Sequence, residues 1–182
     1  MKAIFLDRDG VINEDIHLLY KKEDVIILPE IKKVLSELKN RGFYIIVVTN
    51  QPTVARGLIT EKGVIELDDY INSKIDNLVD KFYFCPHHPN ANIPEYRMIC
   101  ECRKPSPGLI IQASKDLKVN LEESWMIGDM NSDITAGNAA GCKTILIKSS
   151  KNKEEIECGK PYNASKPDYI IKNLLEILNI IK

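Results

Sequence analysis

Two aspartates near the amino terminus have the spacing of a catalytic carboxylate pair. Asp7 and Asp9 stand in the run FLDRDGVIN, directly after the short apolar segment Ala3–Leu6. Side chains two residues apart in an extended chain point to the same side, and two neighbouring carboxylates can share a hard cation such as Mg²⁺. One could also act as a nucleophile while the other transfers a proton. A solvated acidic turn with Arg8 as a local partner is the alternative for an isolated D-x-D pair.

Three further groups of polar residues follow predicted strands or precede a predicted helix. They bring a hydroxyl, two amides, two adjacent cations and two more carboxylates: Thr49-Asn50-Gln51, Arg103-Lys104, and Asp129 with Asp133. Each group alone has an ordinary explanation, because a threonine can cap a strand end and a pair of cations is usually solvated. Together they complete a predicted phosphate site at the carboxyl ends of strands, where open α/β sheets place ligands.

Three cysteines and one histidine form two ligand pairs in a segment without helical or strand periodicity. The pairs are Cys85-x-His87 and Cys100-x-Cys102, with twelve residues between them. Thiolates and imidazole are the ligands of a closed, four-coordinate structural Zn²⁺ site. We therefore expect zinc to give the loop 85–104 a rigidity that it cannot obtain from a core. Small buried residues without a metal are the alternative.

The position of this cluster bears on the two cations. Cys102 adjoins Arg103 and Lys104, so a bound zinc would fix the loop that carries both cations to the phosphate. We expect a structural zinc with no open position for chemistry. The fourth ligand stays open between His87 and the adjacent His88.

The other two cysteines have no place in this cluster. Cys142 starts a predicted strand in AGCKTILI and is expected to be buried. Cys158 stands in the polar segment Lys148–Lys166, which we expect to be a surface loop, and is expected to be a free thiol. Five cysteines are an odd number, so a fully paired disulfide framework is excluded.

Short apolar runs alternate with helical patterns along the chain. The predicted strands are Ala3–Leu6, Tyr44–Val48, Lys81–Phe84, Trp125–Ile127, Thr144–Ile147 and Asp168–Ile171. The predicted helices are Pro29–Asn40, Thr60–Val79, Ser106–Leu117, Asp133–Ala140 and Asn173–Ile181. This alternation predicts an α/β fold, a Rossmann-like parallel sheet with helices on both faces.

The length of 182 residues suits one domain, 1–182. The chain holds 25 Lys+Arg and 26 Asp+Glu, a net charge of −1, so no general attraction to nucleic acid or an anionic membrane is expected. No apolar run has the length of a signal peptide or a membrane span. We expect a cytoplasmic monomer in a reducing compartment.

The motifs DRDGVIN, TNQ, RKP and GDMNSD, in this order, resemble those of the haloacid dehalogenase superfamily of phosphohydrolases. The resemblance implies that Asp7 is the nucleophile that forms an aspartyl-phosphate. It implies that Asp9 protonates the leaving oxygen and then activates water. Thr49 and Lys104 would steady the transferring phosphoryl group.

The same resemblance implies a catalytic Mg²⁺ site. Asp7, the backbone carbonyl of Asp9, and Asp129 would hold the ion, and Asp133 would orient one of its neighbours. The motif FCPHHP, followed by CECRKP, narrows the resemblance to a zinc-containing subgroup with a minimal cap built from loops. Members of that subgroup act on heptose bisphosphates or on histidinol phosphate.

The stretch from Gln51 to Gly57 resembles the heptose enzymes more closely. It implies removal of the 7-phosphate of D-glycero-D-manno-heptose 1,7-bisphosphate, in the biosynthesis of nucleotide-activated heptose for lipopolysaccharide or another surface glycan. The implied substrate contacts are Asp15, His17, Asn50, Gln51, Arg103 and Lys104. His17 could instead be an ordinary exposed loop histidine.

Two departures from the subgroup pattern bear on the substrate. Pro52-Thr53 stands where many heptose enzymes have a Ser-Gly-like pair, and Met130 stands where a Lys or Arg is common. The preferred anomer therefore stays open. Histidinol phosphate or another small sugar phosphate is the alternative substrate, and a non-catalytic zinc-stabilised binding module is the alternative from a different class.

Overall fold

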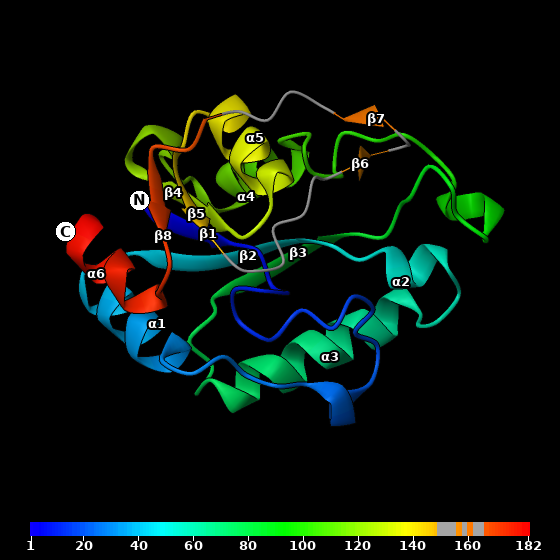
Figure 1. Cartoon of the computed structure of the whole chain (residues 1–182), viewed down its shortest axis with the longest axis horizontal. Coiled ribbons are helices and arrows are strands. Elements are labelled where there is room, and N and C mark those ends of the chain that lie inside the picture. The colour runs from blue at the N-terminus through cyan, green and yellow to red at the C-terminus, as the bar shows by residue number, and fades with distance from the viewer. Residues whose placement is uncertain (149–155, 158–159, 162–165) are drawn as a thin grey trace.

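Six parallel strands form the sheet on which the site is built (Figure 1). The computed structural model describes residues 1–148, 156–157, 160–161 and 166–182. The strands of the sheet are β1 (Ala3–Leu6), β2 (Tyr44–Asn50), β3 (Lys81–Cys85), β4 (Trp125–Gly128), β5 (Lys143–Ile147) and β8 (Tyr169–Ile171). Each strand expected from the apolar runs is present, with ends that differ by two residues at most. The predicted Rossmann-like sheet is confirmed.

The order of the strands, β3–β2–β1–β4–β5–β8, creates a switch point between β1 and β4. From β1 the chain first adds strands on one side and later returns to add β4 on the other. Leu6 is paired with Val47 of β2 and with Ile127 of β4. Open α/β sheets bind ligands beside such a switch point, at the carboxyl ends of the strands.

Helices cover both faces of the sheet (Figure 1). They are α1 (Ile31–Asn40), α2 (Pro52–Ala55), α3 (Glu61–Lys74), α4 (Gly108–Leu117), α5 (Asn131–Ala140) and α6 (Ile177–Ile180). Single turns of 3₁₀ helix are η1 (Lys22–Asp24), η2 (Pro94–Tyr96), η3 (Leu121–Glu123) and η4 (Leu174–Glu176). Helices α1, α3 and α6 lie on one face, whereas α4 and α5 lie on the other.

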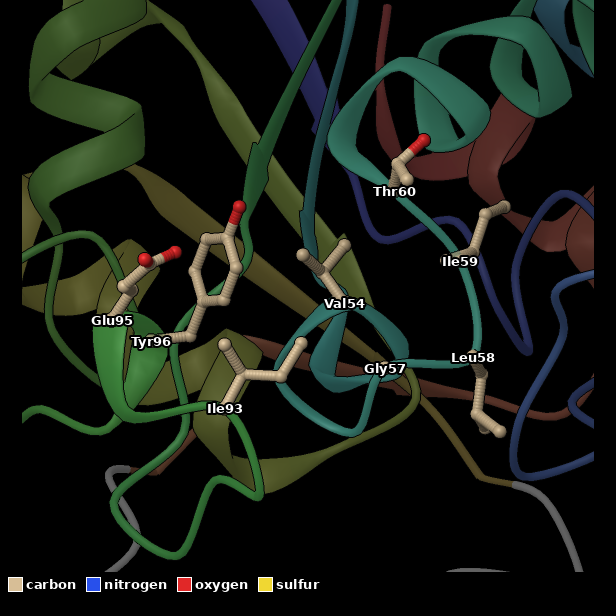
Figure 2. Close-up of a pocket in the computed structure, with 8 residues that line it drawn as sticks. All are labelled: Val54, Gly57, Leu58, Ile59, Thr60, Ile93, Glu95 and Tyr96. Atoms are coloured by element: carbon tan, nitrogen blue, oxygen red, sulfur yellow. The ribbon is translucent and has the colours of Figure 1, made fainter.

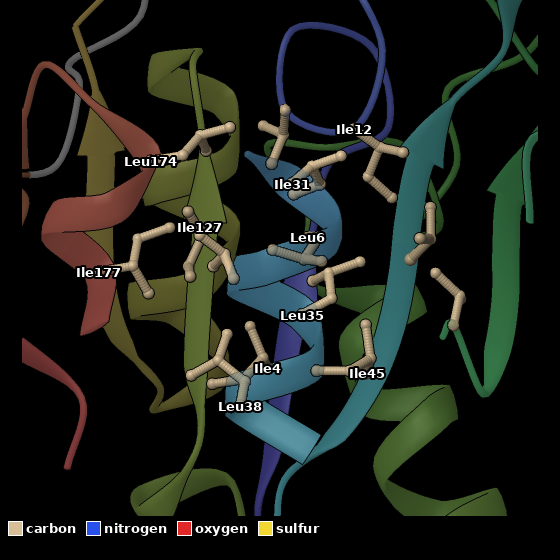
Figure 3. Close-up of a cluster of buried hydrophobic side chains, with 14 of the residues drawn as sticks. Ile4, Leu6, Ile12, Ile31, Leu35, Leu38, Ile45, Ile127, Leu174 and Ile177 are labelled. Carbon is tan, nitrogen blue, oxygen red and sulfur yellow. The ribbon is translucent and has the colours of Figure 1, made fainter. Parts of the chain in front are cut away.

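Alternation along the central strands divides the core into two layers. Ile4 and Leu6 of β1 pack towards α1, and the intervening Phe5 packs towards α4 and α5. Figure 3 shows the first layer, in which Leu35 and Leu38 of α1 face the sheet. The fully buried strands explain why their sequences read as continuous apolar runs.

Residues with positive φ make two helices shorter than the apolar spacing indicates. Glu30 has a φ of 72°, so α1 begins at Ile31 and Pro29 lies outside it. Asp76 and Asn77 also have positive φ, so α3 ends at Lys74 although apolar residues continue at helical spacing beyond it. The predicted start of α1 at Pro29 and the predicted end of α3 at Val79 are therefore wrong, because residues with positive φ cannot continue a right-handed helix.

The predicted cap at Thr60 is present, with its hydroxyl oxygen accepting a 3.0 Å bond from the Gly63 amide. Two other helices differ from their predictions by two residues at the start: α4 begins at Gly108 and α5 at Asn131. The predicted last helix is shorter, because a 3₁₀ turn at Leu174–Glu176 takes its first residues.

The carboxyl edge of the sheet carries only short elements between its strands and the following helices. The connections there hold η1, α2 and η2 in the described part of the chain, which agrees with a cap built from loops. In the predicted loop Lys148–Lys166, the strands β6 (Ile156–Glu157) and β7 (Lys160–Pro161) pair antiparallel. A two-residue ladder is too short to leave an alternating pattern in the sequence. Cys158 lies outside the described residues.

Among the described helices, none combines the length and the apolar character that crossing a membrane requires. The C-terminal segment instead packs on the sheet through Leu174 and Ile177, which are buried in the layer with α1 (Figure 3). This agrees with the expectation of an amphipathic segment docked on the core.

Leu35→Ala should lower the free energy of unfolding by about 3 kcal/mol, because it removes a fully buried side chain and leaves a cavity between α1 and the sheet. Urea unfolding followed by circular dichroism measures the change. Ile65→Ala is the control, since Ile65 is 52% exposed, and it should change stability by less than about 0.5 kcal/mol. Equal losses in both variants would contradict the assigned core.

Candidate active site

The ammonium group of Lys104 lies at the centre of the site. Its Nζ atom lies 3.1 Å from Asp7 Oδ1 and 2.5 Å from Asp133 Oδ1, and it donates a 2.8 Å hydrogen bond to the Val48 carbonyl. The side chain is buried. Burial opposes its charged form, but Asp133 and Asp7 raise the pKa of Lys104 above the ordinary value. A permanent cation therefore faces the predicted nucleophile.

Three carboxylates converge beside this cation. One oxygen each from Asp7, Asp129 and Asp133 lies within 4.8 Å of the others. Burial raises the pKa of Asp7 to about 7 and that of Asp129 to about 8, and neighbouring carboxylates add to both effects. Carboxylate oxygens are the ligands of Mg²⁺, and a divalent cation would favour their ionised forms. The donor set, with its excess of negative charge, fits a hard cation.

Two glycines let the backbone approach these carboxylates. A Cβ atom on Gly10, which has a φ of 86°, would lie 2.2 Å from Asp129 Oδ2. A Cβ on Gly128 would lie 2.1 Å from Asp133 Oδ2. That oxygen also accepts a 3.0 Å bond from the Met130 amide at the start of α5. Both glycines are therefore required by the close packing of backbone against acidic side chains.

The carboxylate of Asp9 accepts hydrogen bonds from a different set of side chains than the carboxylate of Asp7 does. Its Oδ1 accepts from Arg8 Nε (3.2 Å), Arg8 Nη2 (3.1 Å) and Asn13 Nδ2 (2.8 Å), and its Oδ2 accepts from Arg8 Nη2 (3.0 Å) and Gln51 Nε2 (2.9 Å). Burial favours the neutral carboxyl, but the charge of Arg8 and these donors hold the pKa of Asp9 below its ordinary value. Gln51 Nε2 also donates to Thr49 Oγ1 at 3.1 Å.

Arg8 and Asp68 were not expected to take part in the site. Arg8 is fully buried, and its Nη1 atom lies 2.9 Å from Asp68 Oδ1 on α3. The alternative of a solvated acidic turn around Arg8 is therefore wrong, although Arg8 does contact Asp9. Burial raises the pKa of Asp68 to about 6 despite the attraction of Arg8. A signal existed in the sequence, because Asp68 occupies the buried face of α3 between Val64 and Ile71.

Asn50, expected to contact substrate, is bonded to the Lys104 backbone. Its Oδ1 accepts from the Lys104 amide and its Nδ2 donates to the Lys104 carbonyl, each at 3.0 Å. Gln51, also expected to contact substrate, is buried and bonded to Asp9. In this structure both side chains therefore hold Lys104 and Asp9, which are predicted to be catalytic.

The four predicted zinc ligands lie together. The sulfur atoms are 3.6 Å apart between Cys85 and Cys100, and 3.1 Å apart between Cys102 and each of the others. His87 Nδ1 lies 3.3 Å from the Cys102 sulfur. His88 is not part of this cluster; its Nδ1 accepts from the Asn90 amide. The fourth member of the group is thus His87.

The other expected substrate residues lie on loops around the site. Arg103 Nη1 donates a 3.2 Å bond to the His87 carbonyl, which ties this cation to the cysteine cluster. His17 is exposed, has a φ of 75°, and its amide donates to Asp15 Oδ1 at 2.7 Å. The charge of Asp15 contributes to the raised pKa of Asp129, so Asp15 lies near the carboxylate group.

A groove of about 350 Å³ lies between the α2–α3 connection and η2 (Figure 2). Val54, Leu58, Ile93 and Tyr96 are among the residues that line it. The carboxylates predicted to be catalytic are not among the lining residues, so the groove is separate from the carboxylate group described above. Around the groove, the amides of residues 92 and 93 donate to the Ala55 carbonyl and dock the cysteine-rich loop onto α2.

Comparison with known proteins shows the family of this chain. A model of the HAD-hydrolase-like family matches residues 101–177. A Yersinia pestis protein named D-glycero-beta-D-manno-heptose-1,7-bisphosphate 7-phosphatase is 33% identical over 186 residues, covering 99% of this chain and 95% of the relative. The chain belongs to the HAD-like hydrolase family. The predicted superfamily is confirmed, and with it the enzyme class, a phosphoric monoester hydrolase.

Two further HAD-like relatives extend the comparison. A Chlorobaculum tepidum protein named D-glycero-D-manno-heptose-1,7-bisphosphate 7-phosphatase is 37% identical over 164 residues, covering 85% of this chain and 82% of the relative. The crystal structure of D,D-heptose 1.7-bisphosphate phosphatase from B. bronchiseptica, complexed with magnesium and phosphate, matches with a TM-score of 0.79 and 26% identity, covering 99% of both chains.

Gly10→Ala should lower phosphatase activity at least about tenfold and weaken activation by Mg²⁺, because the new methyl group must displace Asp129. Mg²⁺ titration of the initial rate measures both effects. Gly42→Ala is the matched control: Gly42 has a φ of 81° but nothing within 4 Å of the added Cβ, so it brings the backbone strain without the clash. Comparable losses of activity in both would contradict the assigned role of Gly10.

Proposed function

We propose that this enzyme removes the 7-phosphate of D-glycero-D-manno-heptose 1,7-bisphosphate through an aspartyl-phosphate on Asp7. The observation that carries the chemistry is the meeting of Asp7, Lys104, Asp129 and Asp133 at one point of the sheet edge. The names of the relatives support the substrate. The proposed role is in the supply of nucleotide-activated heptose, in the cytoplasm and as a monomer.

In the first half of the reaction, an Asp7 oxygen attacks phosphorus, and the bond from phosphorus to the sugar oxygen breaks. Asp9 gives a proton to the departing oxygen. Lys104 faces Asp7 at 3.1 Å and would neutralise charge on the transferring group. Thr49, held by Gln51, would donate its hydroxyl to the same group.

In the second half, Asp9 takes a proton from water, which attacks phosphorus in the aspartyl-phosphate. The bond between phosphorus and the Asp7 oxygen breaks, which releases inorganic phosphate and frees the Asp7 carboxylate. The structure holds Asp9 as a carboxylate through Arg8, Asn13 and Gln51. This is the form that activates water, and Asp9 must gain a proton before it can act as the acid. Asp7 and Asp129, with the backbone carbonyl of Asp9, would hold Mg²⁺, which supplies charge neutralisation for an anionic substrate when bound.

The cysteine cluster fits a structural zinc. Thiolates about 2.3 Å from a tetrahedral Zn²⁺ lie roughly 3.8 Å from each other, and the observed sulfur separations are 3.1 to 3.6 Å. All four positions would be filled by Cys85, His87, Cys100 and Cys102, so none is left for chemistry. The effect on the site would be geometric, because Cys102 is two residues from Lys104.

Arg103 is the proposed contact for the second phosphate of the substrate. It is anchored to the cysteine cluster through the His87 carbonyl. Met130, which stands next to Asp129, brings no charge to this end of the site. Asp15 and His17 would approach the sugar from the loop that follows β1.

The purified enzyme with Mg²⁺ should release one phosphate from each heptose bisphosphate and leave the 1-phosphate in place. A phosphate-release assay should compare both anomers of the bisphosphate with histidinol phosphate, and nuclear magnetic resonance of phosphorus identifies the remaining phosphate. We expect kcat/KM for one heptose anomer to exceed that for histidinol phosphate by about a hundredfold. A preference for histidinol phosphate would overturn the proposed substrate.

Asp7→Asn is the control for the mechanism in this assay. It removes the nucleophile's charge with little change of volume, so turnover should fall at least about a thousandfold while the protein stays folded. Turnover close to that of the wild type would exclude Asp7 as the nucleophile, whichever substrate is preferred.

Cys102→Ser should lower the zinc content and the phosphatase activity together, each to below about a tenth of the wild-type value. Metal analysis of the purified protein and a rate measurement at saturating Mg²⁺ test this link. Cys142→Ser is the matched control, because Cys142 is buried elsewhere in the core, and it should retain zinc. Loss of zinc with unchanged kinetics would contradict the coupling of the loop to Lys104.

A further inference from the structure

The buried charges around Arg8 extend from the catalytic loop into α3. The Arg8 guanidinium presents its Nε and Nη2 edge to the two oxygens of Asp9, at 3.2 and 3.0 Å. Its remaining terminal nitrogen, Nη1, contacts Asp68 Oδ1 at 2.9 Å. Because the guanidinium group is planar and rigid, a partner on Nη1 fixes the plane against which Asp9 lies.

Asp68 makes no other hydrogen bond that would explain its burial. Its Oδ1 contacts Arg8, and within the described part of the chain no group hydrogen-bonds to its Oδ2. The residue is 2% exposed on a helix whose neighbouring buried positions, Val64, Leu67 and Ile71, are apolar. Removing one partner of a buried ion pair is costly when it leaves the other charge unpaired, so the contribution of Asp68 to stability depends on what else neutralises Arg8.

Asp68 is also dispensable for neutralising Arg8. Asp9 alone takes two nitrogens of the guanidinium, so Arg8 stays paired with a carboxylate when Asp68 is removed. Removing Asp68 would therefore not leave the charge of Arg8 unpaired. It would instead allow the guanidinium group to rotate. The residue that depends on this orientation is Asp9, whose oxygens are shared among Arg8, Asn13 and Gln51.

We propose that Asp68 is a positioning residue for the reaction, which acts through Arg8 to hold the carboxylate of Asp9 in its working orientation. The inference rests on the proposed role of Asp9 as acid and base. It adds a residue of α3, sixty positions from Arg8, to the machinery at the end of β1. Stability alone would not require a carboxylate at this position.

Two variants separate the parts of this role. Asp68→Leu removes both the charge and the acceptor, whereas Asp68→Asn keeps an oxygen that can accept from Arg8 Nη1. Asp69→Leu and Asp69→Asn are matched controls, because Asp69 is the next residue of α3 and is exposed. Thermal unfolding shows whether each variant is folded at the assay temperature.

The deciding measurement compares two leaving groups. A sugar phosphate that the wild type hydrolyses needs a proton on its alkoxide, whereas p-nitrophenyl phosphate has a leaving group stable without one. A misplaced Asp9 should therefore slow the first more than the second. For Asp68→Leu we expect kcat on the sugar phosphate to fall by about tenfold to a hundredfold, within the range of general acid–base effects. KM, and the rate of the first turnover with p-nitrophenyl phosphate, should change by less than about threefold. The losses on the two substrates are compared in this first turnover, because the later hydrolysis of the aspartyl-phosphate, for which Asp9 activates water, is the same for both.

Asp68→Asn should show the same selectivity with a smaller loss, about fivefold on the sugar phosphate and less than about twofold on p-nitrophenyl phosphate, and both Asp69 variants should match the wild type. If Asp68→Leu does not fold, Asp68→Asn decides the question. Unchanged kinetics in the folded Asp68 variants, or equal losses on both substrates, would overturn the positioning role.

Asp9→Asn is the reference that distinguishes the two proposals. It should show the same selectivity for the leaving group, with a larger loss than either Asp68 variant. If Asp9→Asn lacks this selectivity, the proposed acid role of Asp9 fails, and the inference about Asp68 fails with it. If Asp9→Asn shows the selectivity and the Asp68 variants do not, only the inference about Asp68 is wrong.

Discussion

The structure depends on holding several carboxylates at one buried point of the sheet edge. Asp7, Asp129 and Asp133 would repel each other there, and Lys104 is the cation that contacts two of them. Lys104 also bonds to the Val48 carbonyl, so its ammonium group joins β1, β2, α5 and the cysteine-rich loop. Contacts around Lys104 keep its ammonium group in place. They include the paired bonds between Asn50 and the Lys104 backbone and the cysteine cluster that ends two residues earlier.

The two aspartates of the first motif have different surroundings although only Arg8 separates them. Asp7 lies among other carboxylates, and burial raises its pKa to about 7. Asp9 lies among cationic and amide donors, which hold its pKa below the ordinary value. Such divergence is how two similar groups take different roles in one site. A divalent cation beside Asp7 would favour its ionised form, which the proposed role as nucleophile requires.

The sequence predicted most of the helices and strands and most of the residues that meet at the sheet edge. Apolar runs located every strand of the sheet, because buried parallel strands have no polar face. Helix ends were less well predicted, since the left-handed conformations of Glu30, Asp76 and Asn77 leave no mark in the apolar spacing. Asn50 and Gln51 were expected to contact substrate, but their side chains bond to Lys104 and Asp9. Residue type and position could place them at the edge without showing which way they point.

By itself, the sequence predicted the class of chemistry, because its carboxylates and hydroxyl after strands, and its lysine before a helix, match the motifs of a phosphohydrolase superfamily. It also predicted the three cysteines and the histidine of the cluster, with His88 as the alternative to His87. Only the tertiary structure decided how these groups share their bonds. The Arg8–Asp68 pair forms because α3 packs against the sheet, and the Asp7–Lys104 pair forms because the segment before α4 crosses the sheet edge. These contacts join residues far apart in the chain, which local sequence patterns do not encode.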